Sequence, residues 1–280
     1  MKYANLHLHS VYSDSQLTPL QLVLIGKSLG YRALALTDHE TDGGVKEFMK
    51  YAADEGIDSL PGVEFYGNLD DVNFHIVALD YDMENPAFRA FIKERCDLRT
   101  ECTRKCFERG VNMGFIQGAT WEDVLDYADE GSWICIDHVI GALRHKRVLP
   151  PVGGIRELRQ NVFKGPEPKS FSPKHPSVEE VIRVIRQAGG IAILAHPNGK
   201  IPYVPQLVEM GLNGIEVSHA HLFRDTARQA LRAAQQYNLY HSGGTDHTGA
   251  MSGCDGVNAV PALQGIDEEE YLTIKERRLG

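Results

Sequence analysis

Residues 191–197 read IAILAHP, and this stretch decides the fold class. Its first five residues are all apolar, which is typical of a strand buried on both faces in a parallel sheet, and a histidine follows directly. The preceding residues, 177–188, combine a capping-box pattern with one apolar helical face, and Gly189 and Gly190 end that helix. A helix that leads into a buried strand predicts an α/β fold.

The same alternation of strand and helix continues toward both ends of the chain. Thr18 and Pro19 provide an N-cap and a first helical residue, and Gly30 ends that helix. A second helix is expected to begin at Asp42. Six other segments are predicted strands: residues 3–9, 32–37, 57–65, 72–80, 214–217 and 239–242. This pattern predicts a parallel barrel or a doubly wound sheet.

Residues 86–172 differ from the rest of the chain. They are expected to be helical and rich in loops, with a single strand candidate at 133–136, and prolines and glycines punctuate their end. We therefore expect two parts. Residues 1–85 and 173–280 form a barrel, and residues 86–172 form an inserted helical subdomain with a loop on the substrate side.

Composition limits the classes of partner. The chain has 280 residues, of which 42% are hydrophobic and 24% charged, as in soluble globular proteins. A net charge of -9 argues against an extended nucleic-acid surface, although bound cations can still attract a small anionic substrate. No apolar run suits a signal peptide or a membrane span, so we expect no membrane contact and a cytoplasmic location. Nothing in the sequence indicates the oligomeric state.

Cysteine usage excludes two kinds of site. The chain has five cysteines, an odd number, and no pair has CxxC spacing. The sequence therefore suggests neither a disulfide framework nor a thiolate zinc site.

Ionisable residues follow the predicted strands at their carboxyl ends. In a parallel barrel these ends meet on one face, so residues distant in sequence become neighbours. The spacing of His7 and His9 also puts both rings on one side of a strand. The full set is His7, His9, Asp38, His39, Glu64, His75, His196, Asp246 and His247.

Such a cluster predicts a metal centre, because burying so many charges without cations would cost too much free energy. Imidazoles and carboxylates without thiolate suit zinc, manganese or iron. Two or more such ions can bind a phosphate group and activate water.

Several motifs, in this order, resemble the polymerase and histidinol phosphatase (PHP) family. The motifs are HLHSVYSDSQLTP (7–19), LALTDHETDGG (34–44), PGVEF (61–65), the histidine at 75, LAHP (194–197) and GGTDH (243–247). The resemblance covers about residues 3–80 and 174–257. It implies an α/β fold, a distorted (β/α)7 barrel with an inserted helical subdomain, and a centre of two or three divalent ions (manganese, iron or zinc).

The resemblance also implies three ligand sets. The first is His7, His9, Glu64 and Asp246; the second shares Glu64 and adds His75 and His196; the third is Asp14, His39 and a histidine of the last motif. Relatives usually end that motif with Asp-x-His, whereas Asp246 and His247 are adjacent here. Because adjacent strand residues point to opposite faces, His247 reaches the cluster only if the backbone turns sharply.

Other residues are candidates for supporting roles. Asp38 is expected to orient His39 or to cap a helix, and Glu216 to orient a ligand from the end of its strand. His219 and His221 follow the same strand, and for them an ordinary loop position is the stronger expectation.

The segment IDHVIGALRHKRVL (136–149) resembles a stretch of the stand-alone, nucleotide-acting branch of the family. His138 lies on the motif histidine, but Ile136 stands where the branch has an arginine. We expect His138, the nearby Arg144 and the loop of residues 164–169 to contact the phosphorylated substrate. The departure at Ile136 weakens the transfer of substrate identity.

The main hypothesis is a metal-dependent phosphoesterase. Its substrate would be a small phosphate monoester, either a nucleoside monophosphate or a 3′,5′-bisphosphonucleoside, attacked by a metal-activated hydroxide. Histidinol phosphate and oligonucleotide ends are alternatives within the family. An amidohydrolase-type barrel hydrolase is an alternative reaction, and a metal-binding scaffold without activity is a third reading. Phosphate release from a substrate panel separates these hypotheses.

Overall fold

Among the described residues, one sheet contains seven strands whose order in space follows their order in the chain. The computed structural model describes residues 2–149, 154–164, 174–247 and 264–279. The strands are β1 (Ala4–Asn5), β2 (Ala33–Leu36), β3 (Asp58–Leu69), β4 (Val72–Leu79), β5 (Ile191–Leu194), β6 (Gly214–His219) and β7 (Tyr240–Gly244).

Backbone hydrogen bonds bring the last strand back to the first. Leu6 N donates to Gly243 O (3.0 Å), and Asp246 N donates to His7 O (2.9 Å). The sheet is thus a nearly closed barrel, and the predicted distorted seven-stranded barrel is confirmed. Doubly wound topology, the alternative left open by the alternation of elements, is excluded by the strand order.

The direction of β4 departs from a parallel barrel. β4 runs antiparallel to both β3 and β5, whereas the other neighbouring pairs are parallel. The two strands are joined by Asp70 and Asp71, both with positive φ. A parallel pair needs a crossover of about a dozen residues, so this short connection allows only a hairpin.

Helices cover the outside of the barrel. They are α1 (Pro19–Ser28), α2 (Val45–Asp54), α7 (Val178–Gln187), the short 3₁₀ turn Ile201–Tyr203, α8 (Val204–Glu209), α9 (Arg224–Tyr237) and α10 (Glu268–Lys275). The start of α1 is as predicted, because Thr18 and Gln21 form a reciprocal capping box ahead of Pro19. At α7, Ser177 accepts a hydrogen bond from Glu180 N, and the apolar face of the helix is fully buried against the sheet.

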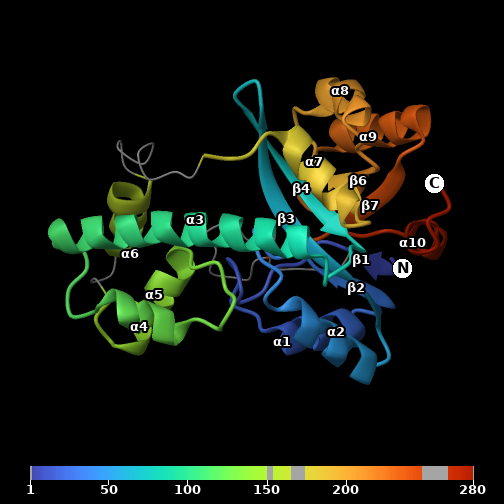
Figure 1. Cartoon of the computed structure of the whole chain (residues 1–280). Coiled ribbons are helices and arrows are strands. Elements are labelled where there is room, and N and C mark those ends of the chain that lie inside the picture. Colours follow the sequence, from blue (N-terminus) through green and yellow to red (C-terminus); the bar gives the residue numbers. More distant parts are fainter. Residues whose placement is uncertain (1, 150–153, 165–173, 248–263, 280) are drawn as a thin grey trace.

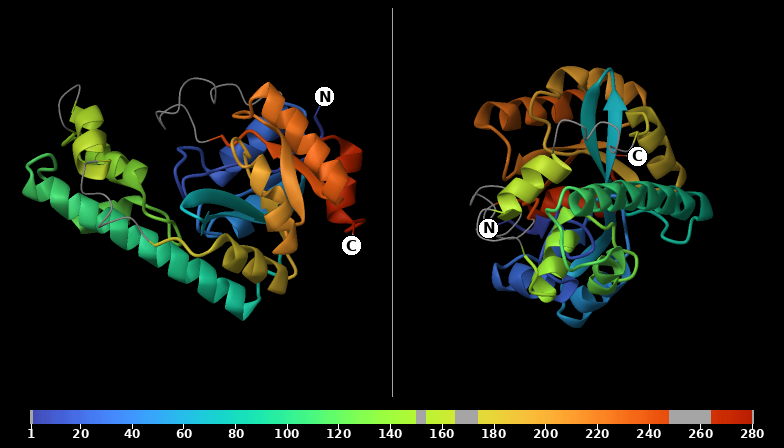
Figure 2. Two further views of the ribbon diagram at one scale, coloured as in Figure 1. Left: turned by 90° about the horizontal axis from the view of Figure 1, so that it is seen from above. Right: turned by 90° about the vertical axis from the view of Figure 1, so that its left-hand side faces the viewer.

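Helices also dominate the segment that follows β4. They are α3 (Pro86–Asn112), α4 (Trp121–Tyr127), α5 (Ile136–His145), α6 (Gly154–Leu158) and the π-helical turn Arg159–Phe163. α3 runs from the barrel along the length of this segment, and α4, α5 and α6 lie along its far part (Figures 1 and 2). A separate apolar cluster, which includes Phe107, Val139, Leu143 and Val162, holds these helices together.

The predicted strand at 133–136 is wrong. Ile136 begins α5, and the extended residues before it pair with no strand. Their backbone groups find other partners: Trp133 N donates to Tyr12 O (3.0 Å), and Ile134 N donates to Thr100 Oγ1 (3.1 Å). These bonds hold the start of α5 against the loop that follows β1.

None of the helices in the described ranges combines the length and the apolar character needed to cross a membrane.

Candidate metal centre

Glu64, on β3, lies at the middle of the site and is completely buried. Ring nitrogens of five histidines lie close to its two carboxylate oxygens. On Oε2 these are His7 Nε2 (3.3 Å), His9 Nε2 (3.4 Å) and His39 Nδ1 (3.0 Å), and on Oε1 they are His75 Nδ1 (2.9 Å) and His196 Nε2 (3.1 Å). The rings come from the ends of β1, β2 and β5 and from β4, so the barrel brings them together as expected.

The electrostatics of the site favour ionised carboxylates. Burial raises the pKa of Glu64, but the neighbouring rings of His7, His39 and His75 hold that pKa well below its usual range. Asp246 is affected in the same way, since His7 and His9 outweigh the effect of burial on its pKa. The same carboxylates raise the pKa of His7 and His9 well above the usual value, although burial alone would lower it. Carboxylates and imidazoles together form a donor set that suits borderline divalent cations.

Several buried atoms of the cluster lack a hydrogen-bond partner in the described part of the chain. They are His7 Nε2, His9 Nε2, His39 Nδ1 and Glu64 Oε2. Buried polar atoms in native proteins nearly always have a partner, and these four converge on one region. Cations at this position would satisfy their lone pairs, so the residues present fit a metal centre.

The geometry of the first predicted ligand set is compact. His7, His9, Glu64 and Asp246 offer ligand atoms that all lie within 4.8 Å of one another. His9 Nε2 is 3.0 Å from Asp246 Oδ1, and His7 Nε2 is 3.6 Å from the same oxygen. Ligands about 2.1 Å from a tetrahedral zinc ion are roughly 3.4 Å apart, so these separations match one shared cation.

The second predicted set shares Glu64. The rings of His75 and His196 meet edge to face with centroids 4.6 Å apart, and both contact Glu64 Oε1. His39 belongs to a compact group with Glu64 and His75 as well. Glu64 therefore lies between two groups of imidazoles, as a bridging carboxylate requires.

The third predicted set is only partly assembled. Asp14, His39 and His9 form a compact group, with His9 Nδ1 3.7 Å from Asp14 Oδ1 and His39 Nε2 3.8 Å from Asp14 Oδ2. In the described residues, none of the compact ligand groups includes His247.

The backbone explains where His247 lies. The chain does turn at Asp246, where φ is 49°, and this turn directs Asp246 into the cluster. His247 then pairs with Leu8 in a parallel bridge. Bridge partners present their side chains on the same face, and Leu8 packs in an apolar cluster with Leu22 and Leu36, on the side opposite to the rings of His7 and His9. These contacts do not assign His247 to the third set, and its role as a ligand stays a prediction.

Glu216 and His219 extend the site beyond the expected ligands. Glu216 Oε1 hydrogen-bonds to His7 Nδ1 (2.7 Å), and Glu216 Oε2 accepts from the backbone N of His196 (2.5 Å). The carboxylate of Glu216 therefore orients His7 with Nε2 toward Glu64, the role anticipated for this residue.

His219 is a residue for which the sequence favoured an ordinary loop position. Its side chain is fully buried, with Nε2 3.6 Å from Asp246 Oδ2 and 3.7 Å from Glu216 Oε2, and burial lowers its pKa to about 4. A register shift in β6 between Glu216 and Ser218 puts Glu216 and His219 on one side. Strand periodicity alone would put Glu216 and His219 on opposite faces of the sheet. The sequence signal for His219 as a site residue was therefore limited to its position close to the end of a predicted strand. His221 is more exposed, and its Nε2 lies 3.9 Å from Asp246 Oδ2.

Asp38 contacts a different partner from the one expected. Its oxygens accept hydrogen bonds from Ser10 N (2.7 Å), Ser10 Oγ (2.6 Å) and Ser13 Oγ (2.5 Å). These bonds hold in place the loop that carries Asp14. They do not orient the ring of His39. Asp38 therefore positions a predicted ligand of the third set from a neighbouring strand.

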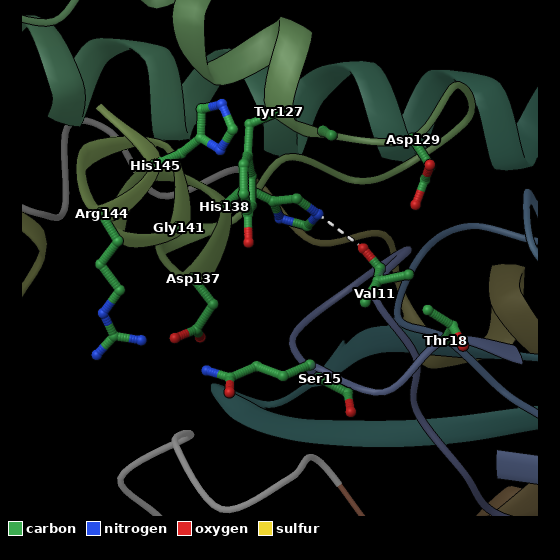
Figure 3. Close-up of a pocket in the computed structure, with 12 residues that line it drawn as sticks. Val11, Ser15, Thr18, Tyr127, Asp129, Asp137, His138, Gly141, Arg144 and His145 are labelled. Carbon is green, nitrogen blue, oxygen red and sulfur yellow. Dashed lines mark hydrogen bonds between the residues drawn. The ribbon is translucent and has the colours of Figure 1, made fainter. Parts of the chain in front are cut away.

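His138 and Arg144 line a cavity of about 650 Å³ beside this loop (Figure 3). The wall also includes Ser15, Tyr127 and Asp137. His138 Nδ1 accepts from Cys135 N (3.1 Å), and His138 Nε2 is 2.8 Å from Val11 O. With both ring nitrogens bonded to backbone, His138 holds the loop after β1 in place, while Arg144 extends along the cavity wall. Of the loop predicted at 164–169, residues 165–169 lie outside the described residues.

Comparisons with known proteins agree with this geometry. The PHP domain family matches residues 5–131. A 3′,5′-nucleoside bisphosphate phosphatase of Chromobacterium violaceum is 31% identical over 262 residues, 88% of this chain and 87% of the relative. A 5′-3′ exoribonuclease of Haemophilus influenzae is 29% identical over 261 residues, 88% of this chain and 89% of the relative. A solved structure from Bifidobacterium adolescentis, described as that of a metal-dependent phosphoesterase, has a TM-score of 0.79 at 25% identity and covers 99% of this chain and 96% of its own.

Proposed function

This chain belongs to the PHP domain family of metal-dependent phosphoesterases, and we propose from that premise that it removes a phosphate group from a small nucleotide, either a nucleoside monophosphate or a 3′,5′-bisphosphonucleoside. The observation that carries the proposal is Glu64, a buried carboxylate with five imidazoles around it, together with Asp246 on the same group. A metal-dependent phosphoesterase needs such a donor set.

We propose that two or three divalent cations, of manganese, iron or zinc, occupy the cluster. Two compact groups of ligand atoms share Glu64: one adds His7, His9 and Asp246, and the other adds His39 and His75. A third group contains His9, Asp14 and His39. When bound, such ions polarise the phosphate oxygens and activate water for attack on phosphorus. Other residues hold the ligands in place: Glu216 orients the ring of His7, and Asp38 holds the loop that carries Asp14.

We assign the nucleoside part of the substrate to the cavity lined by Tyr127 and Arg144. The cavity adjoins the loop that carries Asp14, because Val11 and Ser15 contribute to its wall. Arg144 provides a cation there, and Tyr127 provides an aromatic surface for a base. The similarity to a bisphosphate phosphatase supports this assignment.

The alternatives differ in substrate or in reaction. Three relatives are 5′-3′ exoribonucleases, which keeps oligonucleotide ends as a candidate substrate, and histidinol phosphate is a further one. An amidohydrolase-type barrel would be expected to use a bridging lysine. No lysine directly follows any of the predicted barrel strands, which favours the phosphoesterase.

A phosphate-release screen tests the proposal. The purified protein, loaded separately with manganese, zinc and iron, is incubated with nucleoside monophosphates, 3′,5′-bisphosphonucleosides, histidinol phosphate, a 5′-phosphorylated oligonucleotide and an amide panel. We expect release of phosphate from the nucleotides and loss of activity after chelation. Hydrolysis of amides without release of phosphate would overturn the proposal.

A further inference from the structure

An arginine that belongs to none of the ligand sets lies beside the centre. The guanidinium carbon of Arg99, on α3, is 4.2 Å from the ring centroid of Tyr66 and 4.4 Å from that of Trp133. Both rings also contact His39: Tyr66 stacks on it at 4.9 Å, and Trp133 meets it edge-on at 5.7 Å. One layer of aromatic rings therefore separates a fixed cation from a predicted metal ligand.

Several buried nitrogen atoms around Arg99 have no hydrogen-bond partner among the described residues. Buried atoms without a hydrogen-bond partner include Arg99 Nε, Arg95 Nη2, Trp133 Nε1 and His175 Nδ1. No hydrogen bond or ion pair joins the guanidinium of Arg99 to another residue in the part of the chain that the structure describes. By contrast, Arg104 on the same helix pairs with Glu101 and Glu108.

Neighbouring charges leave this group of donors positive. Arg95, one turn earlier on α3, is buried; its Nε lies 3.4 Å from Glu40 Oε2, and its Nη1 donates to Lys174 O (3.3 Å). Glu40 thus balances one of the two guanidinium charges. Burial, with the two arginines, lowers the pKa of His175 to about 4, so its ring is neutral and leaves the charge of the group unchanged. A positive, acceptor-poor group of donors favours an anion with several oxygens.

We propose that Arg99, with Arg95 behind it and Trp133 and His175 beside it, binds a second phosphate group of the substrate. This inference rests on the proposed function, in which the first phosphate lies at the metal cluster. Ring contacts hold the plane of a guanidinium but leave its edges open to phosphate oxygens, which arginine binds in pairs. The substrate class that fits is a nucleoside with phosphates on two positions of one ribose, such as a 3′,5′-bisphosphonucleoside.

A purely structural role for Arg99 makes a different prediction. As a clamp, Arg99 would only hold α3 against the barrel through Tyr66 and Trp133. A clamp explains the ring contacts but not the missing acceptors. Its loss would disturb the hydrolysis of all substrates alike, whereas loss of a phosphate subsite acts only on substrates that carry the second phosphate.

The test compares Arg99→Gln with the native enzyme on a nucleoside 3′,5′-bisphosphate and on the corresponding 3′-monophosphate. We expect the native enzyme to prefer the bisphosphate, and the substitution to lower the ratio of the two kcat/KM values by about ten-fold or more. Arg99→Lys keeps the charge without the planar fork and should restore part of the ratio. Arg104→Gln, on the same helix, is the matched control and should leave the ratio unchanged.

An unchanged ratio in Arg99→Gln would overturn the inference, whether both activities stay native or fall by the same factor. Thermal unfolding of each variant separates misfolding from loss of the subsite, and Arg99→Lys provides the comparison if Arg99→Gln is unstable. Release of phosphate from monophosphates without preference for a second phosphate would refute the subsite alone. Failure to release phosphate from any nucleotide would instead refute the proposed function.

Discussion

At the scale of single residues, the site depends on one carboxylate that many rings share. Glu64 is surrounded by the rings of His7, His9, His39, His75 and His196. Its negative charge would offset part of the positive charge of any cations bound to those rings. Without cations, the same buried charges and orphan atoms would be costly. Each ligand therefore affects both metal binding and the stability of its neighbours.

Replacing Glu64 should affect more than one metal site. We expect Glu64→Ala to abolish phosphoesterase activity and to lower bound metal by more than one ion per chain, because a bridging carboxylate offsets the repulsion between two cations. Metal content is measured on the purified variant by elemental analysis. Glu84→Ala, at an exposed position, is the control. A full metal complement in Glu64→Ala would rule out the bridging role.

His247 should behave differently from Asp14. Because His247 pairs with Leu8 rather than with the cluster, we expect His247→Gln to keep the native number of metal ions. Asp14→Asn should lose at most one ion, since the compact group that contains Asp14 lacks Glu64 and Asp246. The same elemental analysis, repeated at several metal concentrations, checks both variants. Loss of one ion in His247→Gln would mean that its ring does join the third site.

At the scale of elements, β7 approaches the residues after β1 very closely. A Cβ added to Gly244 would lie 2.4 Å from His7 Cβ and 2.5 Å from His7 N. Only glycine lets the two backbones come this close, and the approach also places Asp246 next to His9. The short β3–β4 hairpin has a comparable effect, because it sets His75 directly opposite Tyr66 and beside Glu64.

Closing the barrel should therefore depend on Gly244. We expect Gly244→Ala to lower the free energy of unfolding by about 1–3 kcal/mol, as overpacking of a well-packed interior does, and to weaken metal binding at the first set. Chemical denaturation and metal titration measure the two effects. Asn73→Ala, exposed on β4, is the control. Native stability in Gly244→Ala would show that the strands can separate without cost.

At the scale of the whole molecule, the candidate ligands lie on the barrel strands or just after their ends. The helical segment α3 to α6 extends beside the barrel (Figure 2). We propose that this segment, as the division into two parts predicts, selects the substrate, and that the barrel performs the reaction. Its residues supply Arg99, Trp133 and Arg144, whereas the barrel supplies the ligand cluster.

Removing the metals should destabilise the whole chain. A ligand present at about a thousand times its dissociation constant stabilises the folded state by roughly 4 kcal/mol. For a chain of this size, chelation should lower Tm by about 5–15 °C, and manganese should restore it. Scanning calorimetry with and without a chelator measures the difference. An unchanged Tm would mean that the cluster folds equally well without cations.

Arg144 should affect nucleotides selectively. We expect Arg144→Ala to raise KM for a nucleoside monophosphate by about ten-fold, the equivalent of one charge-assisted hydrogen bond, and to change KM for a small aryl phosphate far less. Steady-state kinetics on the two substrates decide this, with Arg147→Ala as a control outside the cavity wall. Equal increases in KM would show that Arg144 does not contact the nucleoside part.

The sequence by itself determined the α/β class and most of the residues at the centre of the site, and the family motifs implied the barrel. Residues such as His7, Glu64 and His196 could be identified because they follow short apolar strands, and strand ends in a barrel converge. Both signals are local, since they depend on residue type and on the period of a strand. The family motifs then supplied the expected pairing of ligands.

Tertiary structure alone decided the direction of β4, the face of His247, the burial of His219 and the position of Arg99. The short turn after β3 set the direction of β4, and the bridge to Leu8 set the face of His247. The register shift in β6 set the burial of His219. Arg99 meets Tyr66 and Trp133 only because α3 packs across the barrel, bringing together residues about thirty positions apart. Local periodicity cannot predict these contacts, because irregular backbone and long-range packing set them.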